Sequence, residues 1–379
     1  MKIAFDAKRI FFNETGLGNY GRNVIDGLSQ YYPENQYDLY TPLPVKKQHF
    51  NRFQEYSKYN IITPQNWYYQ KLPSLWRSLG IKKQLQNSKP DIYHGLSLEL
   101  PYGIEKLGIL SIITIHDLIF LKYPHLYKPW DAYVYQKKCF QGAHVSDRII
   151  TISESTKKDI IELYQIPGSK IDVVYPAASP LYYKLPSAQE MEIVIKKYNI
   201  DFPYILSVGS FHERKNLLKP VEALAKLKNS EIKLIFVGRG ERYKRVMVDK
   251  IKALKLEKRV LFIENVPMEN LPALYHHALA SVYPSIYEGF GIPVIESMFC
   301  RTPVILSDRS SLKEAGGEGG IFVDVLSSES IAEAVDRCFD NSEFRLQRSL
   351  QGYAHVQKFH IRNCTDNLMR VYTRLVAEK

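Results

Sequence analysis

The amino-acid sequence predicts an α/β protein with two domains, each built on a parallel sheet covered by helices. Short apolar runs alternate with helical patterns along the chain, which is typical of parallel strands joined by helical crossovers. The series occurs twice, on either side of a polar, proline-containing segment at 178–190 that is typical of a linker. With 379 residues, the chain is long enough for two domains.

The first half opens with a predicted strand at 2–10, a glycine-containing loop at 13–23 and a helix at 23–32. Further strands are predicted at 38–44, 91–97, 111–117, 148–153 and 171–177. Helices are predicted at 81–86, 131–146 and 155–166, the last with Ser155 as its cap. This alternation predicts crossovers on both faces of a parallel sheet.

The second half repeats the pattern. Strands are predicted at 203–209, 232–238, 259–266, 278–285, 302–308 and 319–325. Helices are predicted at 216–228, 269–278, 327–341 and 363–377. Ligands of such domains bind at the carboxyl ends of the strands, so we expect a site facing the cleft between the two halves.

Composition and charge indicate a globular protein with an anionic partner. The chain is 45% hydrophobic and 24% charged, and its formal net charge is +11. This charge favours a nucleotide, a nucleic acid or an anionic membrane surface as partner. The chain contains no run of five or more like charges that would mark a nucleic-acid tail. Basic pairs recur at Lys46-Lys47, Lys82-Lys83, Lys137-Lys138 and Lys157-Lys158.

The four cysteines are far apart and lack zinc-type spacing, so we expect reduced thiols. The chain enters a strand directly, without an apolar signal core, and its most apolar run, 107–115, is too short to cross a bilayer. We therefore expect a cytoplasmic protein that contacts the inner membrane face peripherally at most.

The stretch 283–300, YPSIYEGFGIPVIESMFC, carries two carboxylates beside an expected helix start. Glu288 is predicted in a loop and Glu296 within about the first turn of a helix, with Pro293 at the first helical position. The free N–H groups of that turn and the backbone around Gly291 can accept an anion. The arrangement suits a polyhydroxy ligand that carries phosphate; an ordinary turn with two solvated glutamates is the alternative.

Two more strand ends carry candidate residues. Arg214 and Lys215 stand between a strand and a helix start, where two cations favour a pyrophosphate; a basic helix cap is the alternative. His116 ends a strand and is a candidate for touching a substrate, although a structural histidine is the commoner case. His94 ends another strand and has a weaker claim.

Four motifs follow one another along the chain. They are TGLGNYGRNVIDGL at 15–28, TIHDLIFLKYP at 114–124, VGSFHERKNL at 208–217 and EGFGIPVIE at 288–296. With them the chain resembles a retaining glycosyltransferase of family 4, whose E-x7-E motif the last one matches. The resemblance implies the GT-B fold, with a Rossmann-like acceptor domain at 1–182, a Rossmann-like nucleotide-sugar domain at 183–360, and a C-terminal helix at 361–379 that can cross back to the first domain.

The resemblance also implies residue roles. Glu288 would contact hydroxyls of the transferred sugar, Glu296 would bind the ribose, and Lys215 would neutralise the pyrophosphate. His116 would lie near the reacting sugar, so the catalytic set is His116, Glu288 and Lys215. Further donor contacts would come from Gly16, Gly18, Gly209, Ser210, Arg214, Phe290, Gly291 and Ile292. Many members carry arginine at the position of Ser210, so Arg214 would supply the second phosphate cation.

The implied reaction moves a sugar from a nucleotide sugar, with GDP-mannose preferred over UDP-sugars, to a glycan or lipid-linked acceptor in polysaccharide biosynthesis. We expect no cofactor and no metal, because no DxD motif stands at a strand end and fixed cations can stabilise the leaving group. We expect no nucleic-acid partner. A glycoside hydrolase using Glu288 and Glu296 is one alternative. A non-catalytic sugar-nucleotide-binding module is the other.

Overall fold

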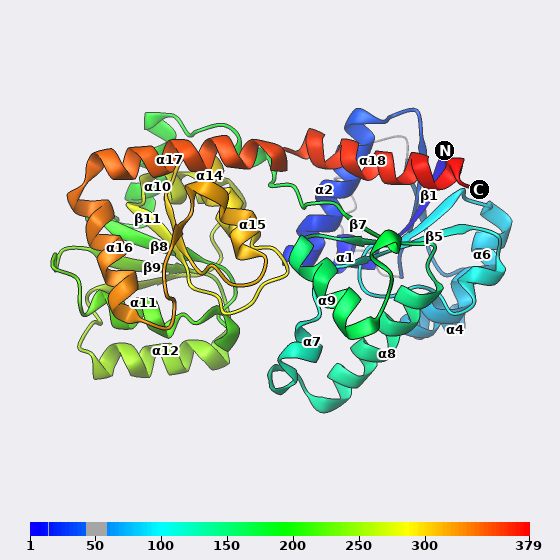
Figure 1. The fold of residues 1–379 in the computed structure, drawn as a ribbon, viewed down its shortest axis with the longest axis horizontal. Helices are drawn as coiled ribbons and strands as arrows, with labels where there is room; N and C mark the ends of the chain where they lie inside the picture. The colour runs from blue at the N-terminus through cyan, green and yellow to red at the C-terminus, as the bar shows by residue number, and fades with distance from the viewer. Residues whose placement is uncertain (14, 43–58) are drawn as a thin grey trace. The chain divides into compact units, whose positions relative to one another are not determined.

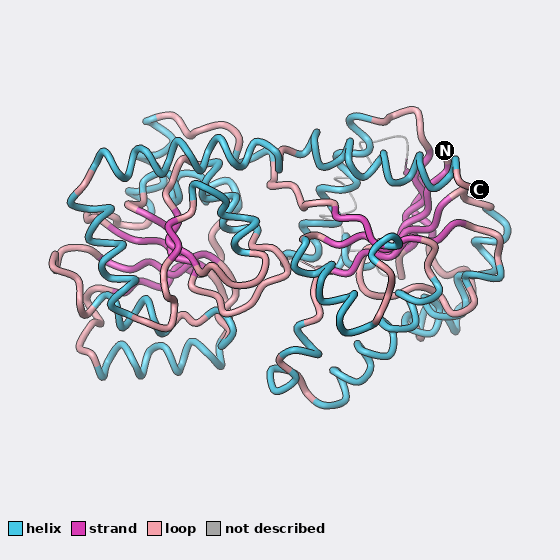
Figure 2. Tube along the Cα trace, viewed as in Figure 1, coloured by secondary structure: helices cyan, strands magenta, loops and turns pink. Residues whose placement is uncertain are grey.

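The computed structural model describes residues 1–13, 15–42 and 59–379. They form two compact units: unit 1 comprises Met1–Ala177 and Ile361–Lys379, and unit 2 comprises Ala178–His360. Each unit contains one parallel sheet with helices, so the predicted fold class is confirmed (Figure 1, Figure 2). The C-terminal helix belongs to unit 1, although unit 2 precedes it in the sequence.

The sheet of unit 1 runs in the order β3-β2-β1-β4-β5-β6-β7, and all neighbouring strands are parallel. The strands are β1 (Lys2–Asp6), β2 (Gln36–Tyr40), β3 (Tyr59–Ile62), β4 (Ile92–Gly95), β5 (Leu110–Ile115), β6 (Arg148–Thr151) and β7 (Ile171–Val173). The chain order reverses between β1 and β4, and the carboxyl ends at such a point are where ligands of open α/β sheets bind.

Side chains alternate across this sheet and pack on two helical layers. Ala4 joins a cluster with Cys139 of α8, whereas its neighbour Phe5 contacts His94, which bonds to Tyr372 of α18. Helices α6, α8 and α9 cover the first face, and α2 and α18 cover the second (Figure 1). The helices of unit 1 are α1 (Lys8–Phe12), α2 (Gly16–Tyr31), α4 (Trp67–Lys71), α5 (Pro73–Leu75), α6 (Ile81–Ser88), α7 (Ile119–Lys122), α8 (Pro129–Val145), α9 (Glu154–Tyr164) and α18 (Ile361–Ala377).

The sheet of unit 2 runs in the order β10-β9-β8-β11-β12-β13 and is also parallel. Its strands are β8 (Tyr204–Val208), β9 (Lys233–Val237), β10 (Val260–Ile263), β11 (Ala280–Tyr283), β12 (Val304–Leu306) and β13 (Ile321–Phe322). Its helices are α10 (Ala188–Lys197), α11 (Leu218–Leu224), α12 (Glu241–Ala253), α13 (Leu271–His277), α14 (Ile292–Phe299), α15 (Leu312–Gly316), α16 (Ser328–Asp340) and α17 (Ser342–Val356).

Some element boundaries differ from the prediction. The first strand ends at Asp6, because the Asp6 carboxylate accepts a hydrogen bond from the N–H of Lys8 (3.2 Å) as the chain turns into α1. Helix α9 is capped by Ser153, whose Oγ accepts from the N–H of Thr156 (3.0 Å), and the predicted cap Ser155 lies in its first turn. Helices α12 and α17 were not predicted.

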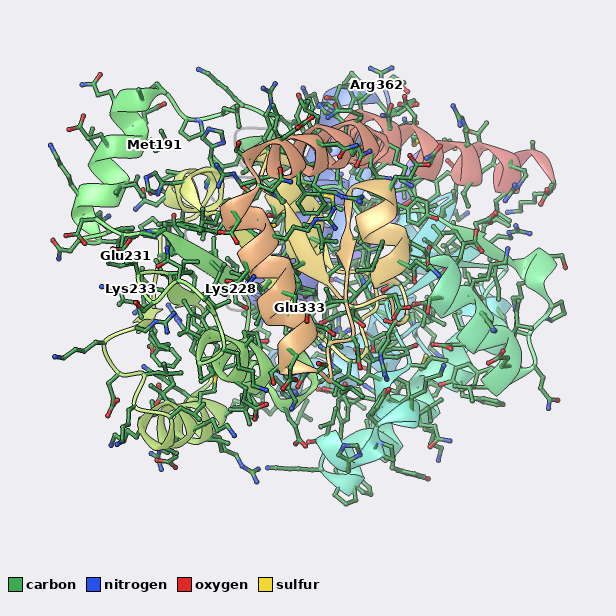
Figure 3. All side chains as sticks on the ribbon, turned by 60° about the vertical axis from the view of Figure 1, so that its left-hand side comes forward. Met191, Lys228, Glu231, Lys233, Glu333 and Arg362 are labelled. Atoms are coloured by element: carbon green, nitrogen blue, oxygen red, sulfur yellow. The ribbon has the colours of Figure 1, made fainter. Side chains whose placement is uncertain are left out.

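Several charged residues lie at the amino end of β9. Lys228, Glu231 and Lys233 gather there in Figure 3, at the opposite end of the strand from its carboxyl terminus. Within the described ranges, no helix combines the length and the apolarity needed to cross a membrane. The basic pair Lys46-Lys47 and the end of the predicted strand at 38–44 lie outside the described residues.

Candidate active site

The candidate site of unit 2 lies where the chain order of its sheet reverses. β8 and β11 are neighbours, with β9 beyond β8 and β12 beyond β11. Loops that leave such a pair diverge, which opens a crevice at the carboxyl ends of the strands. A pocket lies there, lined by Gly209, Ser210, Lys215, Tyr283 and Ser285 among others.

Gly209 keeps space free at the end of β8. Its φ of 144° lies in a region that side chains rarely adopt, and a Cβ added there would meet no atom within 4 Å. A larger residue would be strained and would take up this space. The pocket wall therefore depends on the glycine, and Ser210 follows it in the same wall.

Lys215 is the buried cation of the pocket, with 9% of its surface exposed. It ends a 3₁₀ turn that begins after His212, whose Nδ1 accepts from the N–H of Arg214 (3.3 Å). Lys215 Nζ donates to the hydroxyl of Tyr283 and lies 4.5 Å from the centre of that ring. Burial lowers the pKa of Lys215, while the nearby Glu288 acts to raise it.

The carboxylate of Glu288 receives three contacts on one oxygen. Its Oε1 lies 2.6 Å from Lys215 Nζ and 2.8 Å from Arg214 Nη1, and it accepts a hydrogen bond from Tyr283 (3.2 Å). Burial by itself would raise the pKa of this carboxyl, but Lys215 and Arg214 outweigh burial and lower the pKa to about 2. Glu288 is therefore an anion at neutral pH and neutralises charge on both cations.

Two serines hold the loop that carries Glu288. Ser310 Oγ accepts from the N–H of Glu288 (3.0 Å), and Ser311 Oγ donates to the carbonyl of Glu288 (2.8 Å). These serines stand 22 and 23 positions further along the chain, so no local motif signals the contact. Sequence reasoning missed them, and it missed Tyr283 as well.

Phe290, Gly291 and Ile292 lead the chain from this loop into α14. Gly291 has a φ of 107°, and a Cβ there would lie 2.6 Å from Leu312 Cδ2, so the turn needs glycine. Phe290 is buried, and Ile292 is the first residue of the helix. Pro293 thus takes the second helical position rather than the predicted first one.

Glu296 has a different environment from Glu288. Because α14 begins at Ile292, Glu296 is its fifth residue and lies just beyond the first turn in which it was predicted. It is half-buried, and its Oε2 accepts a hydrogen bond from Tyr275 (3.3 Å). Across the described ranges it forms no ion pair. Burial raises the pKa of Glu296 to about 7, although hydrogen bonds from Tyr275 and Tyr182 act to lower it.

In unit 1, His116 lies buried directly after β5. Its Nε2 donates to the carbonyl of Leu96 (2.8 Å), so Nδ1 is the acceptor nitrogen of the neutral ring. Tyr20 makes an edge contact with this ring, with centroids 4.7 Å apart. Burial lowers the pKa of His116 to about 4. The histidine is therefore uncharged at neutral pH, and its Nδ1 is left to accept a hydrogen bond.

The hydrogen bonds of His94 give this buried histidine a structural role. Its two ring nitrogens bond to the hydroxyls of Tyr372 (2.6 Å) and Thr114 (2.7 Å), so it ties α18 to the centre of the sheet. Both nitrogens are occupied, and burial lowers the pKa of His94 to about 3. The weaker claim of His94 as a substrate contact therefore loses its support.

The predicted glycine loop of unit 1 is the start of a helix. α2 begins at Gly16, because Asn13 Oδ1 accepts from the N–H groups of Thr15 (2.8 Å) and Gly18 (3.2 Å) and caps the first turn. A Cβ on Gly18 would lie 1.8 Å from the carbonyl oxygen of Asn13, whereas one on Gly16 would meet nothing within 4 Å. Gly18 thus serves packing, and Gly16 is the glycine with open space beside it.

The described part of the chain contains no group of three or more His, Cys, Asp or Glu side chains that could hold a metal ion. The four cysteines are buried as free thiols. The pair His276-His277 provides no exception, since His276 Nδ1 bonds to the carbonyl of Cys300 (2.9 Å).

Both halves of the chain match known families. The model described as "Glycosyltransferase Family 4" matches residues 16–180, and the model "Glycosyl transferases group 1" matches residues 190–355. O-antigen chain mannosyltransferase B of Escherichia coli is 30% identical over 296 residues, which are 77% of this chain and 76% of that protein. O-antigen chain mannosyltransferase RfbU of Salmonella typhimurium is 28% identical, over 74% of this chain and 72% of its own.

Solved structures share the fold over the whole chain. Anabaena HepE in complex with UDP and glucose superposes with a TM-score of 0.77 at 15% identity, covering 99% of this chain and 100% of its own. Sucrose-phosphate synthase of Thermosynechococcus elongatus reaches 0.77 at 20% identity, with full coverage of both chains. The fold, with two parallel-sheet units and a C-terminal helix that belongs to the first, agrees with the family matches on both halves of the chain. The chain belongs to glycosyltransferase family 4 and is a glycosyltransferase with the GT-B fold.

Proposed function

We propose that this enzyme moves mannose from GDP-mannose to a glycan or lipid-linked acceptor in polysaccharide biosynthesis, with retention of anomeric configuration. The observation that carries the proposal is the cluster of Arg214, Lys215 and Glu288 beside the pocket at the ends of β8 and β11. Mannose is favoured because the relatives described above are named O-antigen chain mannosyltransferases. UDP-sugars are the second choice, since HepE was solved with UDP and glucose.

In the proposed reaction, the bond from the sugar C1 to the phosphate oxygen breaks, and a bond from C1 to the acceptor oxygen forms on the same face. The proton of the acceptor hydroxyl passes to the leaving phosphate, so no protein base is needed. Negative charge grows on that phosphate as the bond breaks. Lys215 and Arg214 are held in place before the donor arrives, and such fixed groups stabilise developing charge without reorganising.

The ion pairs of Glu288 link its carboxylate to the binding of the donor in this reaction. A diphosphate that binds Lys215 and Arg214 competes with the Glu288 carboxylate for both cations. We propose that the carboxylate then turns to hydroxyls of the sugar. Glu296 would accept hydrogen bonds from the ribose, and the backbone around Gly291 would meet sugar and phosphate. His116 and the backbone of Gly16 are the proposed donor contacts of unit 1.

We propose that no divalent metal takes part, because Lys215 and Arg214 supply the charge that a metal would bring to the diphosphate. The experiment is a steady-state transfer assay in excess EDTA with an acceptor extracted from a polysaccharide-producing cell. Full activity is expected. Activity that vanished and returned with magnesium or manganese would refute metal independence.

The donor is tested by calorimetric titration with GDP, UDP, GDP-mannose and UDP-glucose. GDP-mannose should bind at least about tenfold tighter than UDP-glucose, a difference of about 1.4 kcal/mol. Tighter binding of the UDP compounds would overturn the donor assignment.

The anomeric configuration of the product, read from its proton couplings, tests retention. Membership of the family favours sugar transfer over the two alternatives, a glycoside hydrolase and a non-catalytic binding module. Rapid hydrolysis of simple glycosides in the absence of nucleotide would instead support the hydrolase.

A further inference from the structure

The serine that follows β11 combines complete burial with an unused hydroxyl. Ser285 stands two residues beyond Tyr283, which ends the strand, and has no exposed surface. Across the described residues, its Oγ has no hydrogen-bond partner. A hydroxyl buried in this way has lost its hydrogen bonds to water without replacing them, which lowers the stability of the folded chain. Because most buried polar groups are paired, Ser285 indicates a partner that the free protein does not supply.

Other serines of unit 2, a unit that the structure describes throughout, show the ordinary case. Three of them also have no exposed surface, and each has a partner. These are Ser297, Ser307 and Ser311, which bond to a serine hydroxyl, a backbone N–H and a backbone carbonyl. The fold of unit 2 thus satisfies its buried serines elsewhere, and Ser285 is the exception among these four.

The exception lies in the wall of the candidate site. Ser285 lines the pocket at the ends of β8 and β11 together with Gly209, Lys215 and Tyr283. The pocket wall therefore contains an ammonium group and an unpaired hydroxyl, and both can donate hydrogen bonds. Two such donors suit a ligand whose oxygens accept and carry negative charge, which is the chemistry of a phosphate.

The turn that carries the two cations holds the loop of Ser285 in place. The N–H of Ile286 donates to the carbonyl of Arg214 (3.0 Å), and the Arg214 guanidinium donates to the carbonyl of Tyr287. The residues that follow Ser285 are thus tied to Arg214 by both its backbone and its side chain. The hydroxyl of Ser285 is therefore fixed beside Lys215 before a ligand arrives, and preorganised donors bind developing charge without reorganising.

The size of the pocket shows that a ligand must widen it. Its volume is about 10 Å³, which is room for one water molecule and too little for a phosphate. A diphosphate therefore reaches Ser285 only as side chains of the wall adjust. The proposed turn of Glu288 away from Lys215 supplies this movement, because it releases Lys215 Nζ from a contact of 2.6 Å and lets the lysine shift with the ligand.

We propose that Ser285 Oγ donates a hydrogen bond to the diphosphate of the bound donor, beside Lys215. The free protein leaves the hydroxyl unpaired, and the donor supplies its partner, so the loss of stability in the free site is recovered as affinity. The bond strengthens in the reaction, since hydrogen bonds to charged acceptors are stronger and charge grows on the leaving phosphate. The proposal rests on the proposed function, because the diphosphate is that of the nucleotide sugar.

The first test compares the thermal stability of two serine variants without ligand. Ser285→Ala removes an unpaired hydroxyl, so the unfolding temperature should rise by about 1–3 °C. The matched control is Ser281→Ala on the same strand, where the buried Oγ bonds to Ser297 (2.6 Å). Its unfolding temperature should fall by about 1–3 °C. Equal falls in both variants would show that Ser285 has a partner in the free protein and would overturn the proposal.

The second test is calorimetric titration with guanosine, GDP and GDP-mannose. Ser285→Ala should bind GDP and GDP-mannose about tenfold more weakly than wild type does, the loss of one charge-assisted hydrogen bond, and should bind guanosine equally well. Ser281→Ala should match wild type with all three ligands. A loss confined to GDP-mannose would assign the hydroxyl to the sugar, and an equal loss with guanosine would show general damage to the pocket. Either result would contradict a contact to the diphosphate.

Kinetics adds a measurement that a purely structural serine would not change. At saturating donor, kcat of Ser285→Ala should fall at least about threefold, since the bond is stronger in the transition state. The proposed function can fail separately from this inference. If wild type bound UDP more tightly than GDP, the donor assignment would fail, and Ser285→Ala should then lose UDP affinity by the same factor. If wild type bound GDP and Ser285→Ala bound it equally well, only the role of Ser285 would be refuted.

Discussion

Glu288 and Glu296 lie on one loop and helix, yet the fold surrounds their carboxylates in opposite ways. Glu288 has two cations and a tyrosine on a single oxygen, and its pKa is lowered to about 2. Glu296 has tyrosine hydroxyls and no cation, and its pKa is raised to about 7. Since burial acts to raise the pKa of both carboxyls, the difference comes from the partners that each side chain meets.

This difference indicates what each carboxylate can do when a donor binds. Glu288 is charged at neutral pH and already pairs with Lys215 and Arg214, so the proposed binding of a diphosphate to these cations would rearrange its contacts. Glu296 is close to half ionised at neutral pH, so a ligand that donates hydrogen bonds to it must also favour loss of its proton. In the proposed reaction, Glu288 is thus coupled to the charge of the phosphate, and Glu296 is coupled to pH.

The largest effect is expected from Lys215→Met, which removes the cation that both Glu288 and the donor would use. Turnover should fall about 10²–10³-fold, the usual loss when a preorganised donor to developing charge is removed. Glu288 would also lose its closer ion pair, so its pKa should rise and the thermal unfolding temperature should fall. Single-turnover kinetics and a thermal melt measure the two effects.

Lys219→Met is the matched control for this variant. Lys219 stands four positions further on and pairs with Glu222 (2.7 Å) on the surface of α11, away from the pocket. Turnover should stay within about twofold of wild type, since exposed ion pairs contribute little. Equal losses in the two lysine variants would show that the cation of Lys215 has no special part.

The second-largest effect is expected from Glu288→Gln, which distinguishes the roles proposed for the two glutamates. The amide cannot hold two cations as the carboxylate does, and it cannot stabilise positive charge on the sugar. Turnover should fall about 10- to 100-fold, which corresponds to about 1.4–2.7 kcal/mol. Binding of GDP should be at least as tight as in wild type, because the competing anion is gone. Calorimetry and steady-state kinetics test this, and weakened GDP binding with normal turnover would reverse the assignment.

Much of this site could be predicted because its residues sit at strand ends. Strand, glycine and turn patterns placed Gly209, Lys215 and Glu288 at carboxyl ends of parallel strands, where the fold does bring them to one pocket or its edge. The structure of the segment 13–23 in unit 1 was not predicted correctly, because most of the predicted glycine loop is helical. Its helix starts early because Asn13 caps it, and a single asparagine before a glycine-rich run gives no boundary signal.

The tyrosine and serine partners of the two glutamates could not be predicted, although the cations Lys215 and Arg214 were. Tyr275 comes from α13 and Tyr283 from β11, and nothing in either segment marks a tyrosine hydroxyl as a carboxylate contact rather than as core packing. Ser310 and Ser311 bond to the backbone of Glu288 from 22 and 23 positions further along the chain, so no local pattern indicates these contacts.

A smaller effect is expected from Glu296→Gln, which resembles the protonated form of the carboxyl. A ribose contact is the same in ground and transition states, so its weakening should raise the donor KM about 5- to 30-fold, or about 1–2 kcal/mol, with kcat nearly unchanged. Steady-state kinetics at pH 8 gives both constants. A loss confined to kcat would contradict the ribose assignment.

The same variant should change the response to pH. In wild type, Glu296 becomes protonated as pH falls through about 7, so donor affinity should drop by up to about tenfold per pH unit below that point. Because the folded protein binds this proton more tightly than the unfolded chain, stability should also decline as pH rises from about 4.5 to about 7. Glu296→Gln should flatten both curves, while Glu288→Gln should flatten neither.

The smallest effect, and the finest test of the comparison, is expected from Tyr275→Phe. Its hydroxyl donates to Glu296 Oε2 (3.3 Å) and favours the ionised carboxylate, so its removal should raise the pKa of Glu296 further. The midpoint of the pH dependence of GDP binding should move up by about half to one pH unit, the equivalent of one modest hydrogen bond. Tyr204→Phe is the control, because that hydroxyl donates to the carbonyl of Leu274 on the same helix and not to a carboxylate. It should lower stability and leave the midpoint in place. If both variants moved the midpoint alike, or if Tyr275→Phe moved it down, the tyrosine could not be what holds Glu296 near half ionisation, and the contrast between the two glutamates would need another cause.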